Sequence, residues 1–504
     1  MTMVMHEPTC PQGATSLTPR RLSNQPLELA GKRVHFVGIG GSGMSGLARI
    51  AQHAGAACTG SDLDNSTLIE SLQHDGFAVT LRQTTESVPA QCDLLVISAA
   101  IKADHPEVLE ARRRGIEVIK YAQMLGRLMI GRTGVAVAGT HGKSSTTSML
   151  SHVLIQAGLD PSVIVGATCK QIGGGARSSS IAPGSPGSPG HPGSPGGILV
   201  AEACEYDRSF HNFNPTHAVI LNVEADHLDI YKSLEEVVES FAVFARKLND
   251  LPPQAGATLL INHEMPHRLT ITAGLNCQVQ TIGFAPQADW RVEVSGAACP
   301  SVKLLYHSQV RAEWKSPMPG EHMAYNAAAA AVLASQLGTP WDAIVRGIES
   351  FAGLDRRMQH LGQRDVGGQR ITVVDDYGHH PTEVDTTLRA LRRHYEPKRL
   401  ICVFQPHQHS RTRFLMNEFA SSFSEADIVI VPDIYFVRDS EQERQAVTAA
   451  DLVDRLRQRG KAAMHLYPFE AIVEQLEVIT RDGDLVVTMG AGDVWKIGTA
   501  FLKS

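Results

Sequence analysis

Aromatic residues and an excess of basic charge are what this sequence most lacks. Phe, Trp and Tyr make up 6% of its 504 residues, and 46 Lys and Arg stand against 52 Asp and Glu, for a net charge of −6. A nucleic-acid-binding protein usually carries a basic balance or a basic face. The composition therefore argues against a nucleic-acid partner, but it leaves room for a locally basic pocket that binds a phosphorylated small molecule.

Paired cysteines and long apolar runs are also missing. None of the eight cysteines has the Cys-x-x-Cys spacing, which argues against zinc, and in so long a chain they are expected to be reduced thiols of a cytoplasmic protein. No apolar run is long enough to span a bilayer, so membrane insertion is not expected. Residues 1–29 carry no apolar signal segment and are predicted to form a disordered tail.

Short β-branched runs, each followed by a turn and a helical stretch, are abundant. A chain of 504 residues is expected to form two to four domains, and these runs fall into three blocks. We predict an α/β fold with a Rossmann-like N-terminal domain (30–130), a central P-loop ATPase-type α/β domain (131–350) and a C-terminal Rossmann-like α/β domain (351–504), with parallel sheets buried on both faces. The predicted strands are 33–37, 94–98, 135–138, 162–165, 198–201, 218–221, 371–374, 400–404, 428–431 and 485–488.

One segment interrupts the central block. Residues 183–197 read PGSPGSPGHPGSPGG, and this composition has almost no apolar side chains with which to pack a core. We predict a flexible surface loop there. The Ala-rich stretch 323–337 is predicted to be a tightly packed helix, because Ala has the highest helix propensity.

A glycine-rich motif follows the strand predicted at 33–37. It contains Gly38, Gly40, Gly41, Ser42, Gly43 and Met44. Glycines at a strand-to-helix turn let the backbone approach a phosphate, and the helix N-terminus favours negative charge. Asp62 lies where a dinucleotide fold has its ribose-binding acid. An NAD(P)-dependent oxidoreductase is therefore one interpretation, and a turn without a ligand is another.

A second motif, GTHGKSS at 139–145, follows the strand predicted at 135–138 and leads into a predicted helix. In such a loop the backbone amides hold phosphates, Lys143 balances their charge, and a hydroxyl of Ser144 or Ser145 reaches Mg²⁺. A lysine buried beside a glycine turn would otherwise lack a counter-charge. The sequence therefore predicts an ATP site, which the oxidoreductase interpretation leaves unexplained.

Acidic residues and a histidine follow the next two predicted strands. Glu202 comes directly after 198–201, and His227 follows 218–221. Because parallel strands bring their carboxyl ends to one edge, we expect both side chains beside the P-loop, as ligands of Mg²⁺. For Glu205 and Asp207 a solvated acidic loop is an equal alternative.

Six further segments carry a family resemblance. The stretches EACEYDRSF, LNVEADHLDIY, GEHMAYNAAAA, LDRRMQHLG, DDYGHHPTEV and QPHQHSRTR, with the compact GTHGKSS loop, resemble the Mur ligase family in order and spacing from Gly31 onward. The resemblance implies three domains that bind a UDP-sugar, ATP and an amino acid. The DDYGHHPTE and RTR segments favour the alanine-adding branch over the branch that recycles murein tripeptide. They imply ATP-dependent ligation of L-alanine to the lactyl carboxylate of UDP-N-acetylmuramate through an acyl phosphate.

The resemblance also assigns site residues. The ATP-binding set is Gly139, Thr140, His141, Gly142, Lys143, Ser144, Ser145, His322, Asn326 and Arg357. The metal ligands would be Ser144, Glu202 and His227. The substrate-binding set is Gly38, Gly40, Gly41, Ser42, Gly43, Met44, Ser61, Asp62, Ser98, Tyr377, His379, His407, Arg411 and Arg413. The catalytic set is Lys143, Glu202, His227, His379 and Arg411.

Two of these residues have stated roles in the amide-forming step. Arg411 would grip the carboxylate of the amino acid. His379 is a candidate for the general base that removes a proton from the amine, because the pKa of a histidine lies near working pH. A packing role is the alternative for any one of the 22 histidines.

Four residues depart from the pattern of the family: Cys204, Tyr206, Met323 and Gln408. Cys204 and Tyr206 stand where Asp and Ser are usual, Met323 replaces an Asn on the adenine side, and Gln408 replaces an Arg beside His407. A catalytically silent relative that binds UDP-sugars therefore remains an alternative. The protein is expected to be a monomer or a weak homodimer.

Overall fold

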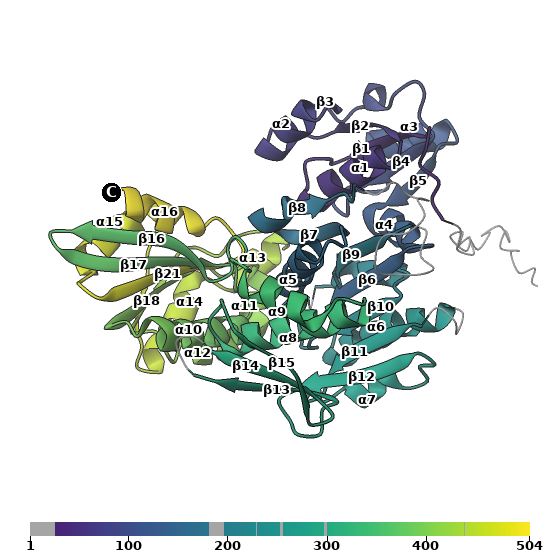
Figure 1. The fold of residues 1–504 in the computed structure, drawn as a ribbon. Coiled ribbons are helices and arrows are strands. Elements are labelled where there is room, and N and C mark those ends of the chain that lie inside the picture. Colours follow the sequence, from purple (N-terminus) through teal and green to yellow (C-terminus); the bar gives the residue numbers. More distant parts are fainter. Residues whose placement is uncertain (1–25, 181–195, 228, 252–255, 297–299, 438) are drawn as a thin grey trace, which may run out of the picture.

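Three β-sheets with their helices follow one another along the chain (Figure 1). The computed structural model describes residues 26–180, 196–227, 229–251, 256–296, 300–437 and 439–504. The predicted tail lies outside the described residues except for 26–29, and so does the predicted Gly/Pro/Ser loop except for Gly196 and Gly197. The three-block α/β architecture predicted from the sequence is confirmed.

The N-terminal sheet has five parallel strands in the order β3-β2-β1-β4-β5. All four residues of β4 are buried, as expected for a strand covered on both faces. Its strands are β1 (Arg33–Val37), β2 (Ala57–Ser61), β3 (Ala78–Thr80), β4 (Leu94–Ile97) and β5 (Glu117–Lys120). Its helices are α1 (Ser42–His53), α2 (Thr67–His74), α3 (Pro106–Arg113) and α4 (Tyr121–Met129).

The central sheet has ten strands in the order β15-β14-β13-β12-β11-β10-β6-β9-β7-β8. The strands are β6 (Thr133–Ala138), β7 (Ser162–Cys169), β8 (Gly174–Arg177), β9 (Ile198–Ala203), β10 (His217–Ile220), β11 (Thr258–Asn262), β12 (Gln278–Gly283), β13 (Trp290–Ser295), β14 (Ser301–Tyr306) and β15 (Gln309–Lys315). The helices are α5 (Lys143–Gln156), α6 (Leu234–Arg246), α7 (Arg268–Thr272), α8 (Glu321–Gln336) and α9 (Trp341–Glu349).

The central sheet is not parallel throughout, so that part of the prediction is wrong. Strands β13, β14 and β15 form an antiparallel meander at one edge, and β8 runs antiparallel to β7 at the other. In β15 most side chains are exposed, and only Ala312 and Trp314 are buried. An edge strand with one solvated face carries no continuous apolar run, which is why the sequence pattern did not reveal it.

The C-terminal sheet has six strands in the order β16-β17-β21-β18-β19-β20, parallel except for β16. Its strands are β16 (Gln359–Val366), β17 (Gln369–Asp376), β18 (Arg399–Phe404), β19 (Ile428–Val431), β20 (Ala462–His465) and β21 (Asp484–Met489). Its helices are α10 (Pro381–Tyr395), α11 (His409–Phe414), α12 (Met416–Ser422), α13 (Glu441–Ala446), α14 (Ala449–Gln458), α15 (Phe469–Ile479) and α16 (Trp495–Lys503).

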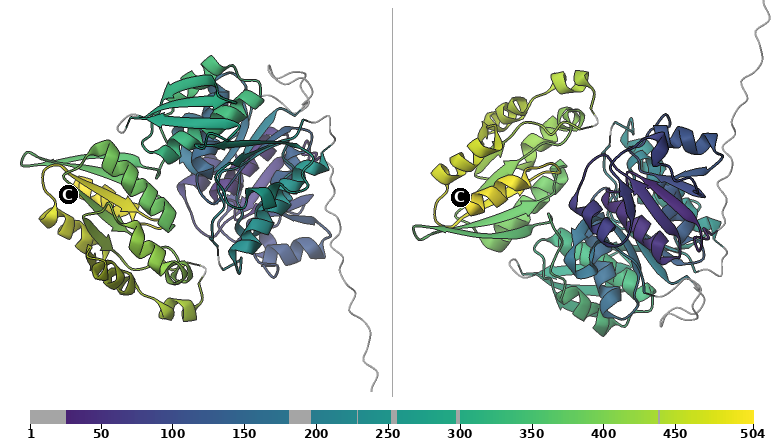
Figure 2. Two further views of the ribbon diagram at one scale, coloured as in Figure 1. Left: turned by 90° about the horizontal axis from the view of Figure 1, so that it is seen from below. Right: turned by 90° about the horizontal axis from the view of Figure 1, so that it is seen from above.

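The N-terminal and central domains pack closely, whereas the C-terminal domain lies to one side of both (Figure 2). Helix α1 contacts β7 and β8 of the central sheet. The contact is tight at Gly46, because a Cβ atom added there would overlap the side chain of Ala176. The C-terminal domain meets the central domain along the face that carries the P-loop.

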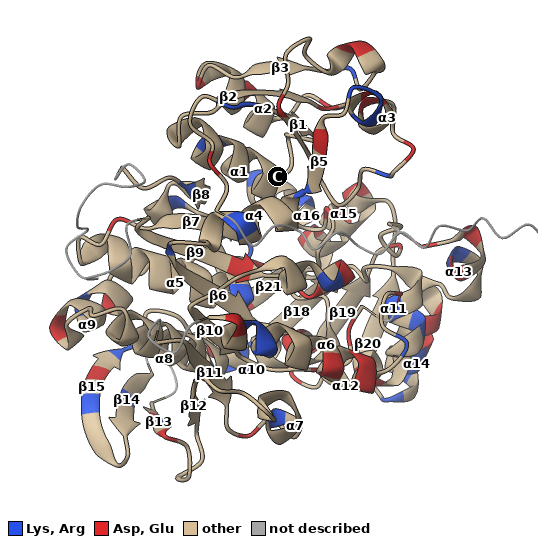
Figure 3. Ribbon diagram, turned by 90° about the vertical axis from the view of Figure 1, so that its right-hand side faces the viewer, with Lys and Arg blue, Asp and Glu red and all other residues tan. Residues whose placement is uncertain are grey.

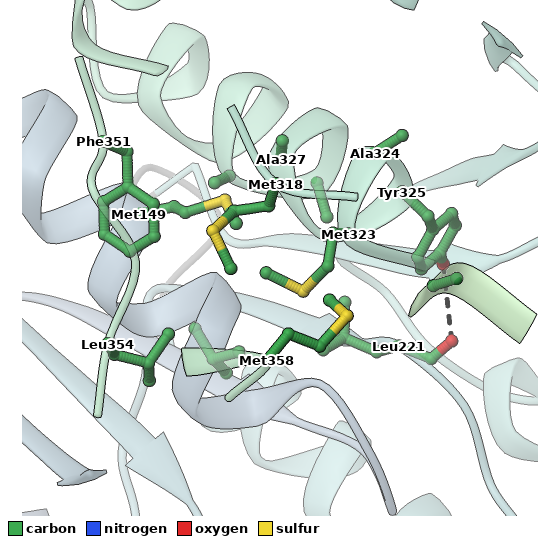
Figure 4. Close-up of a cluster of buried hydrophobic side chains, with 14 of the residues drawn as sticks. Met149, Leu221, Met318, Met323, Ala324, Tyr325, Ala327, Phe351, Leu354 and Met358 are labelled. Carbon is green, nitrogen blue, oxygen red and sulfur yellow. Dashed lines mark hydrogen bonds between the residues drawn. The ribbon is translucent and has the colours of Figure 1, made fainter. Parts of the chain in front are cut away.

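Methionines fill the core between the P-loop helix and the Ala-rich helix. Helix α5 packs against α8, and Met149, Met318, Met323 and Met358 lie together there (Figure 4). The flexible thioether chain of Met fills irregular gaps. The helix predicted at 323–337 is confirmed as α8, and twelve of its residues are buried.

Surface charge is mixed in sign. Acidic and basic residues are interspersed on helices such as α14, where Asp451 lies in the first turn and Arg455 and Arg457 in the last (Figure 3). Among the described residues, no helix is both long and apolar enough to cross a membrane.

Candidate active site

The P-loop is the turn between β6 and α5. Strand β6 is buried along its whole length and ends at Ala138, and α5 begins at Lys143. Gly142 has a φ of 82°, which favours glycine, and a Cβ atom there would lie 2.6 Å from Oδ1 of Asn326. Both features favour glycine at this position, and the turn leads directly into the N-terminus of α5, where free backbone amides can bind phosphate.

Lys143 is held at the mouth of this turn. Its Nζ donates hydrogen bonds to the carbonyls of Gly139 at 2.6 Å and Thr140 at 2.9 Å, and it lies 2.9 Å from Oε2 of Glu205. Burial opposes the charge, but the attraction of Glu205 outweighs it and raises the pKa of Lys143. Glu205 is therefore the counter-charge of the lysine, and the solvated-loop interpretation of this residue is wrong.

Ser144, Glu202 and His227 lie around the same turn. The Ser144 hydroxyl donates to Oε2 of Glu202 at 2.9 Å, and the backbone amide of Gly166 donates to the same oxygen at 2.8 Å. His227 has Nε2 3.5 Å from Oε1 of Glu205, and its Nδ1 is buried with no hydrogen-bond partner among the described residues. The chain thus offers a hydroxyl, a carboxylate and an unpaired imidazole nitrogen to one region.

The loop after β10 forms the other wall of the turn. The backbone amide of His141 donates to Oδ1 of Asn222 at 2.7 Å, and the Asn222 amide donates back to the His141 carbonyl at 3.1 Å. The backbone amide of Glu224 donates to the hydroxyl of Thr140 at 2.9 Å. Because β6 and β10 are adjacent and parallel, their carboxyl ends bring these loops together, as the sequence predicted.

The N-terminus of α10 brings the C-terminal domain against the P-loop. Glu383, in its first turn, lies with Oε1 3.2 Å from Nδ1 of His141 and 3.5 Å from Nη1 of Arg357. Thr382 donates to Oε2 of Glu224 at 2.6 Å. The contacts of Glu383 with His141 and of Thr382 with Glu224 cross from one domain to the other.

Tyr377, His379 and His407 line the C-terminal side of the cleft. The rings of Tyr377 and His379 meet edge to face at 5.4 Å, and those of His379 and His407 at 5.8 Å. The guanidinium of Arg357 lies 5.1 Å from the centre of the Tyr377 ring. The D-D-Y-G-H-H run therefore faces the P-loop, as the family resemblance implied.

The pKa of His379 differs from the sequence-based expectation. Burial, with help from nearby Arg411, lowers the pKa of His379 to about 4, although Glu383 opposes the shift. The expectation of a pKa near working pH is therefore wrong. The ring is neutral at pH 7, and a neutral imidazole can still accept a proton or a hydrogen bond.

Arg411 and Asp226 form a buried ion pair across the cleft. Nη2 and Nε of Arg411 lie 2.8 Å and 2.9 Å from Oδ1 of Asp226. Burial raises the pKa of Asp226, but the charge of Arg411 outweighs this and the pKa is lowered. Asp226 immediately precedes His227, so the same loop serves both the P-loop side and Arg411.

These side chains line two adjoining cavities of about 390 and 150 Å³. The larger cavity brings together most of the predicted phosphate, metal and amino-acid residues: Thr140, His141, Gly142, Lys143, Ser144, Glu202, His227, Arg357, Tyr377, His379, His407 and Arg411. The smaller one is lined by His141, Gly142, Ser145, His322, Asn326 and Arg357, among others. Residues that sequence reasoning did not single out in these walls include Asp226, Glu224, Thr382 and Glu383.

Two residues of α8 shape the smaller cavity. Burial lowers the pKa of His322 to about 4, and its Nδ1 has no hydrogen-bond partner among the described residues. Asn326 packs under Gly142 and donates to the sulfur of Met323 at 3.8 Å. The side chain of Met323 points into the methionine core, and the residue also lines the smaller cavity (Figure 4). This departure from the family pattern therefore replaces a polar contact with an apolar one.

The glycine-rich motif lies at the carboxyl edge of the N-terminal sheet. The amide of Gly38 donates to the carbonyl of Ser61 at 2.8 Å, and the amide of Gly40 donates to Oδ2 of Asp62 at 2.8 Å. A Cβ on Gly38 would lie 2.9 Å from the hydroxyl of Ser98. The structure thus gathers Ser61, Asp62 and Ser98 around the turn, and α1 begins with Ser42 and includes Gly43 and Met44.

Three of the predicted substrate residues have other partners. The hydroxyl of Ser61 is fully buried and donates to Glu107 at 2.7 Å, so this side chain does not face a ligand. The carboxylate of Asp62 organises the turn through Gly40. Arg413 is half-exposed, pairs with Glu443 at 3.0 Å, and is absent from the walls of the two cavities just described.

Family models match almost the whole described chain. Residues 33–133 match "Mur ligase family, catalytic domain", residues 137–334 match "Mur ligase middle domain", and residues 356–492 match "Mur ligase, glutamate ligase domain". The breaks between the matches fall between the three sheets.

Curated relatives match over similar lengths. A UDP-N-acetylmuramate–L-alanine ligase of Caldanaerobacter subterraneus subsp. tengcongensis is 39% identical over 476 residues, which cover 94% of this chain and 97% of the relative. A protein of the same name from Geobacter sp. (strain M21) is 38% identical over 476 residues, with 94% and 97% covered.

Solved structures have the same fold. The UDP-N-acetylmuramate–alanine ligase of Thermotoga maritima matches with a TM-score of 0.72 at 24% identity, covering 94% of this chain and 98% of that one. A murein peptide ligase of Psychrobacter arcticus matches with a TM-score of 0.67 at 23% identity, with the same coverage. Because the family models and the relatives span nearly the whole molecule, the chain belongs to the Mur ligase family.

Proposed function

We propose that this protein joins L-alanine to the lactyl carboxylate of UDP-N-acetylmuramate and cleaves ATP to ADP and phosphate in doing so. The observation that carries the proposal is the larger cavity. Its central-domain wall presents Lys143, Glu202 and His227, and its C-terminal wall presents Arg357 and Arg411. Curated relatives that bear this activity in their names match 94% of the chain at 38–39% identity.

The chemistry requires such a cavity because a carboxylate is a poor acyl donor. An oxygen of the lactyl carboxylate attacks the γ-phosphorus of ATP, the bond to ADP breaks, and an acyl phosphate forms. The amine of alanine then attacks the acyl carbon, and the C–O bond breaks so that the oxygen leaves with the phosphate. Two anionic reactants must be aligned, and the cations Lys143 and Arg357 neutralise their charge.

The nucleotide fits the P-loop and the smaller cavity. The amides at the start of α5 and the ammonium of Lys143 face the phosphates, and displacing Glu205 from Lys143 frees that charge for them. His322, with its unpaired Nδ1, and Asn326 provide polar atoms for the base. The glycine-rich motif at Gly38 would bind the UDP diphosphate.

Mg²⁺ fits the group formed by Ser144, Glu202 and His227. Two hard oxygens suit this ion, and the buried Nδ1 of His227 lacks any other partner among the described residues. When bound there, Mg²⁺ would neutralise phosphate charge. Of the two serines, Ser144 is favoured as a ligand because its hydroxyl already contacts Glu202.

The amino-acid end of the cavity contains Arg411, His379 and His407. The planar guanidinium of Arg411 suits a carboxylate such as that of alanine. In this structure it binds the carboxylate of Asp226. His379 is uncharged, so it can hold the amine in place by a hydrogen bond, although a pKa of about 4 makes it a weak base for the amine's proton. Its Nδ1 lies 3.2 Å from the carbonyl of Tyr377, which leaves Nε2 for the amine.

The test is product identification with defined substrates. The purified protein is incubated with ATP, Mg²⁺, UDP-N-acetylmuramate and one amino acid at a time, and the products are identified by mass spectrometry. We expect the alanyl amide of the sugar nucleotide, with the highest kcat/KM for L-alanine among alanine, serine and glycine. Amide formation with murein tripeptide but not with alanine would assign the chain to the other branch of the family. No amide with any substrate would support a silent relative.

A further inference from the structure

Three side chains gather where the P-loop meets the C-terminal domain, apart from the residues proposed for Mg²⁺. They are His141 of the P-loop, Glu224 after β10 and His380, which caps α10. One ligand atom from each lies within 4.8 Å of the other two. The exposed fractions of the His141 and His380 side chains are 13% and 6%. The Glu224 side chain is 34% exposed. The group therefore brings together two buried imidazoles and a partly exposed carboxylate from two domains.

The ring of His141 is oriented as a metal ligand would be. Its Nδ1 faces Oε1 of Glu383 at 3.2 Å, so the Nδ1–H is directed to that carboxylate. Its Nε2 is buried, has no hydrogen-bond partner among the described residues, and faces Oε2 of Glu224 at 3.6 Å. A histidine that binds a metal through one nitrogen usually donates its other N–H to a carboxylate or a carbonyl. Two acceptor atoms that face each other need a cation between them, and a proton or a metal ion can serve.

His380 shows the same arrangement. Its Nε2 lies 3.3 Å from the carbonyl of Ala225, which can accept the Nε2–H and leave Nδ1 with its lone pair. That Nδ1 lies 3.8 Å from Oε2 of Glu224. Unlike Nε2 of His141, this nitrogen already accepts a hydrogen bond, which the amide of Thr382 donates at 3.3 Å to cap α10, and a metal bound there would displace that cap. Glu224 is itself fixed by the Thr382 hydroxyl at 2.6 Å.

We propose that His141, Glu224 and His380 form a binding site for a divalent transition-metal ion of the zinc class, and that the ion bridges the central and C-terminal domains. Two imidazoles and one carboxylate suit zinc better than Mg²⁺, which prefers oxygen. The sequence argument against zinc concerned cysteines, none of which belongs to this group. Tetrahedral zinc bonds of about 2.0–2.2 Å place ligand atoms about 3.3–3.6 Å apart. The three ligand atoms lie within 4.8 Å of one another, so the widest separation must close by up to about 1.5 Å.

Metal binding replaces one proton with a divalent ion, so the group gains one positive charge. In the absence of an ion, burial opposes protonation of His141, but Glu383 and Glu224 outweigh it and raise its pKa to about 9. The incoming ion takes the Nε2 lone pair, and the Nε2 proton leaves to solvent. The affinity should therefore rise with pH between 6 and 9, because less work is needed to remove that proton.

The test is a titration of the full-length, nucleotide-free protein with Co²⁺ and Zn²⁺. Co²⁺ held by the three side chains and one water would have four ligands and give intense visible absorption, and Zn²⁺ is followed by calorimetry. Two variants remove ligands with little other change: His380→Asn keeps a side chain that can cap α10, and Glu224→Gln keeps an acceptor for Thr382. His394→Asn, the same substitution near the end of α10, is the matched control.

We expect one ion per chain, the visible Co²⁺ band, and a thermal midpoint that rises with Zn²⁺. Affinity should fall at least tenfold in His380→Asn and Glu224→Gln and stay unchanged in His394→Asn. Equal affinity in all four proteins would overturn the proposal, and so would a loss of binding only in Glu202→Gln. The absence of a Co²⁺ band in the wild-type protein would show that a proton alone occupies the group. None of these readouts depends on which sugar or amino acid the enzyme uses.

Discussion

Arg411 of α11 and Asp226 of the loop after β10 hold each other across the cleft, with Nη2 of Arg411 2.8 Å from Oδ1 of Asp226 and both side chains buried. The pair joins the domain proposed to bind the amino acid to the domain that carries the P-loop. Removing one partner of such a buried ion pair is strongly destabilising, because the other charge is left buried without a partner. The carboxylate of Asp226 occupies the guanidinium of Arg411, to which the carboxylate of alanine would bind. We therefore propose that alanine competes with Asp226 for Arg411.

The first prediction concerns Arg411→Lys. A lysine cannot reproduce the two-pronged hydrogen bonding of a guanidinium to a carboxylate. Since a hydrogen bond to a charged group contributes about 1.5–3 kcal/mol, we expect the KM for L-alanine to rise roughly ten- to a hundredfold. The KM for ATP should change little. Steady-state phosphate release at varied alanine concentration measures both.

Arg413→Lys provides the matched control two residues away. Arg413 is exposed, pairs with partly buried Glu443 and does not line the larger cavity, so its substitution should leave the KM for alanine within about twofold. A larger effect at Arg413 than at Arg411 would place the amino acid elsewhere in the C-terminal domain.

The second prediction separates the two serines of the P-loop. The Ser144 hydroxyl contacts Glu202, whereas Ser145 lines the smaller cavity. Ser144→Ala should raise the Mg²⁺ concentration needed for half-maximal turnover by roughly tenfold or more, and Ser145→Ala should raise it far less. Turnover measured against free Mg²⁺ at saturating ATP decides the matter, and the reverse ranking would move the metal to Ser145.

The third prediction concerns Lys143→Ala. Removing this charge should lower kcat by at least about 10²–10³-fold, because charge developing on the phosphates loses its nearest ammonium. Lys398→Ala is the control, since Lys398 is exposed and pairs with Asp482 on the far side of the C-terminal domain. Full turnover in Lys143→Ala would refute the P-loop assignment.

The fourth prediction is a dependence of domain contact on pH. The pKa of His141 is raised from 6.5 to about 9 in the folded protein. Its charge therefore stabilises the folded state fully below pH 6.5, and this contribution is lost as the pH rises through 9. The thermal midpoint of the metal-free, nucleotide-free protein should therefore fall by a few degrees between pH 7 and pH 10. In His141→Gln this fall should be smaller. An identical fall in both proteins would show that His141 does not link the domains.

Local sequence patterns predicted the elements that build the P-loop. The strand predicted at 33–37 matches β1, and the one at 135–138 lies within β6, because runs buried on both faces are largely apolar. The glycine turn before Lys143 was visible because Gly142 is required by its backbone conformation. In contrast, the antiparallel β14 and β15 have one solvated face and gave no comparable run.

Contacts between domains could not be read from the sequence in this way. Glu383 follows His379 by four residues, but its value to the site comes from His141, more than two hundred residues earlier. The pairing of Asp226 with Arg411 likewise depends on how two sheets meet. The pKa of His379 was misjudged because burial in the folded protein, which the sequence does not reveal, lowers it. Only the family resemblance pointed to these segments.

The most direct test of the proposed activation of a sugar-linked acid by ATP follows one oxygen atom. UDP-N-acetylmuramate labelled with ¹⁸O in its lactyl carboxylate is incubated with the protein, ATP, Mg²⁺ and L-alanine, and the released phosphate is analysed by mass spectrometry. If the carboxylate attacks the γ-phosphorus, one labelled oxygen should appear in each phosphate formed from doubly labelled sugar. Amide formation accompanied by unlabelled phosphate would contradict the account.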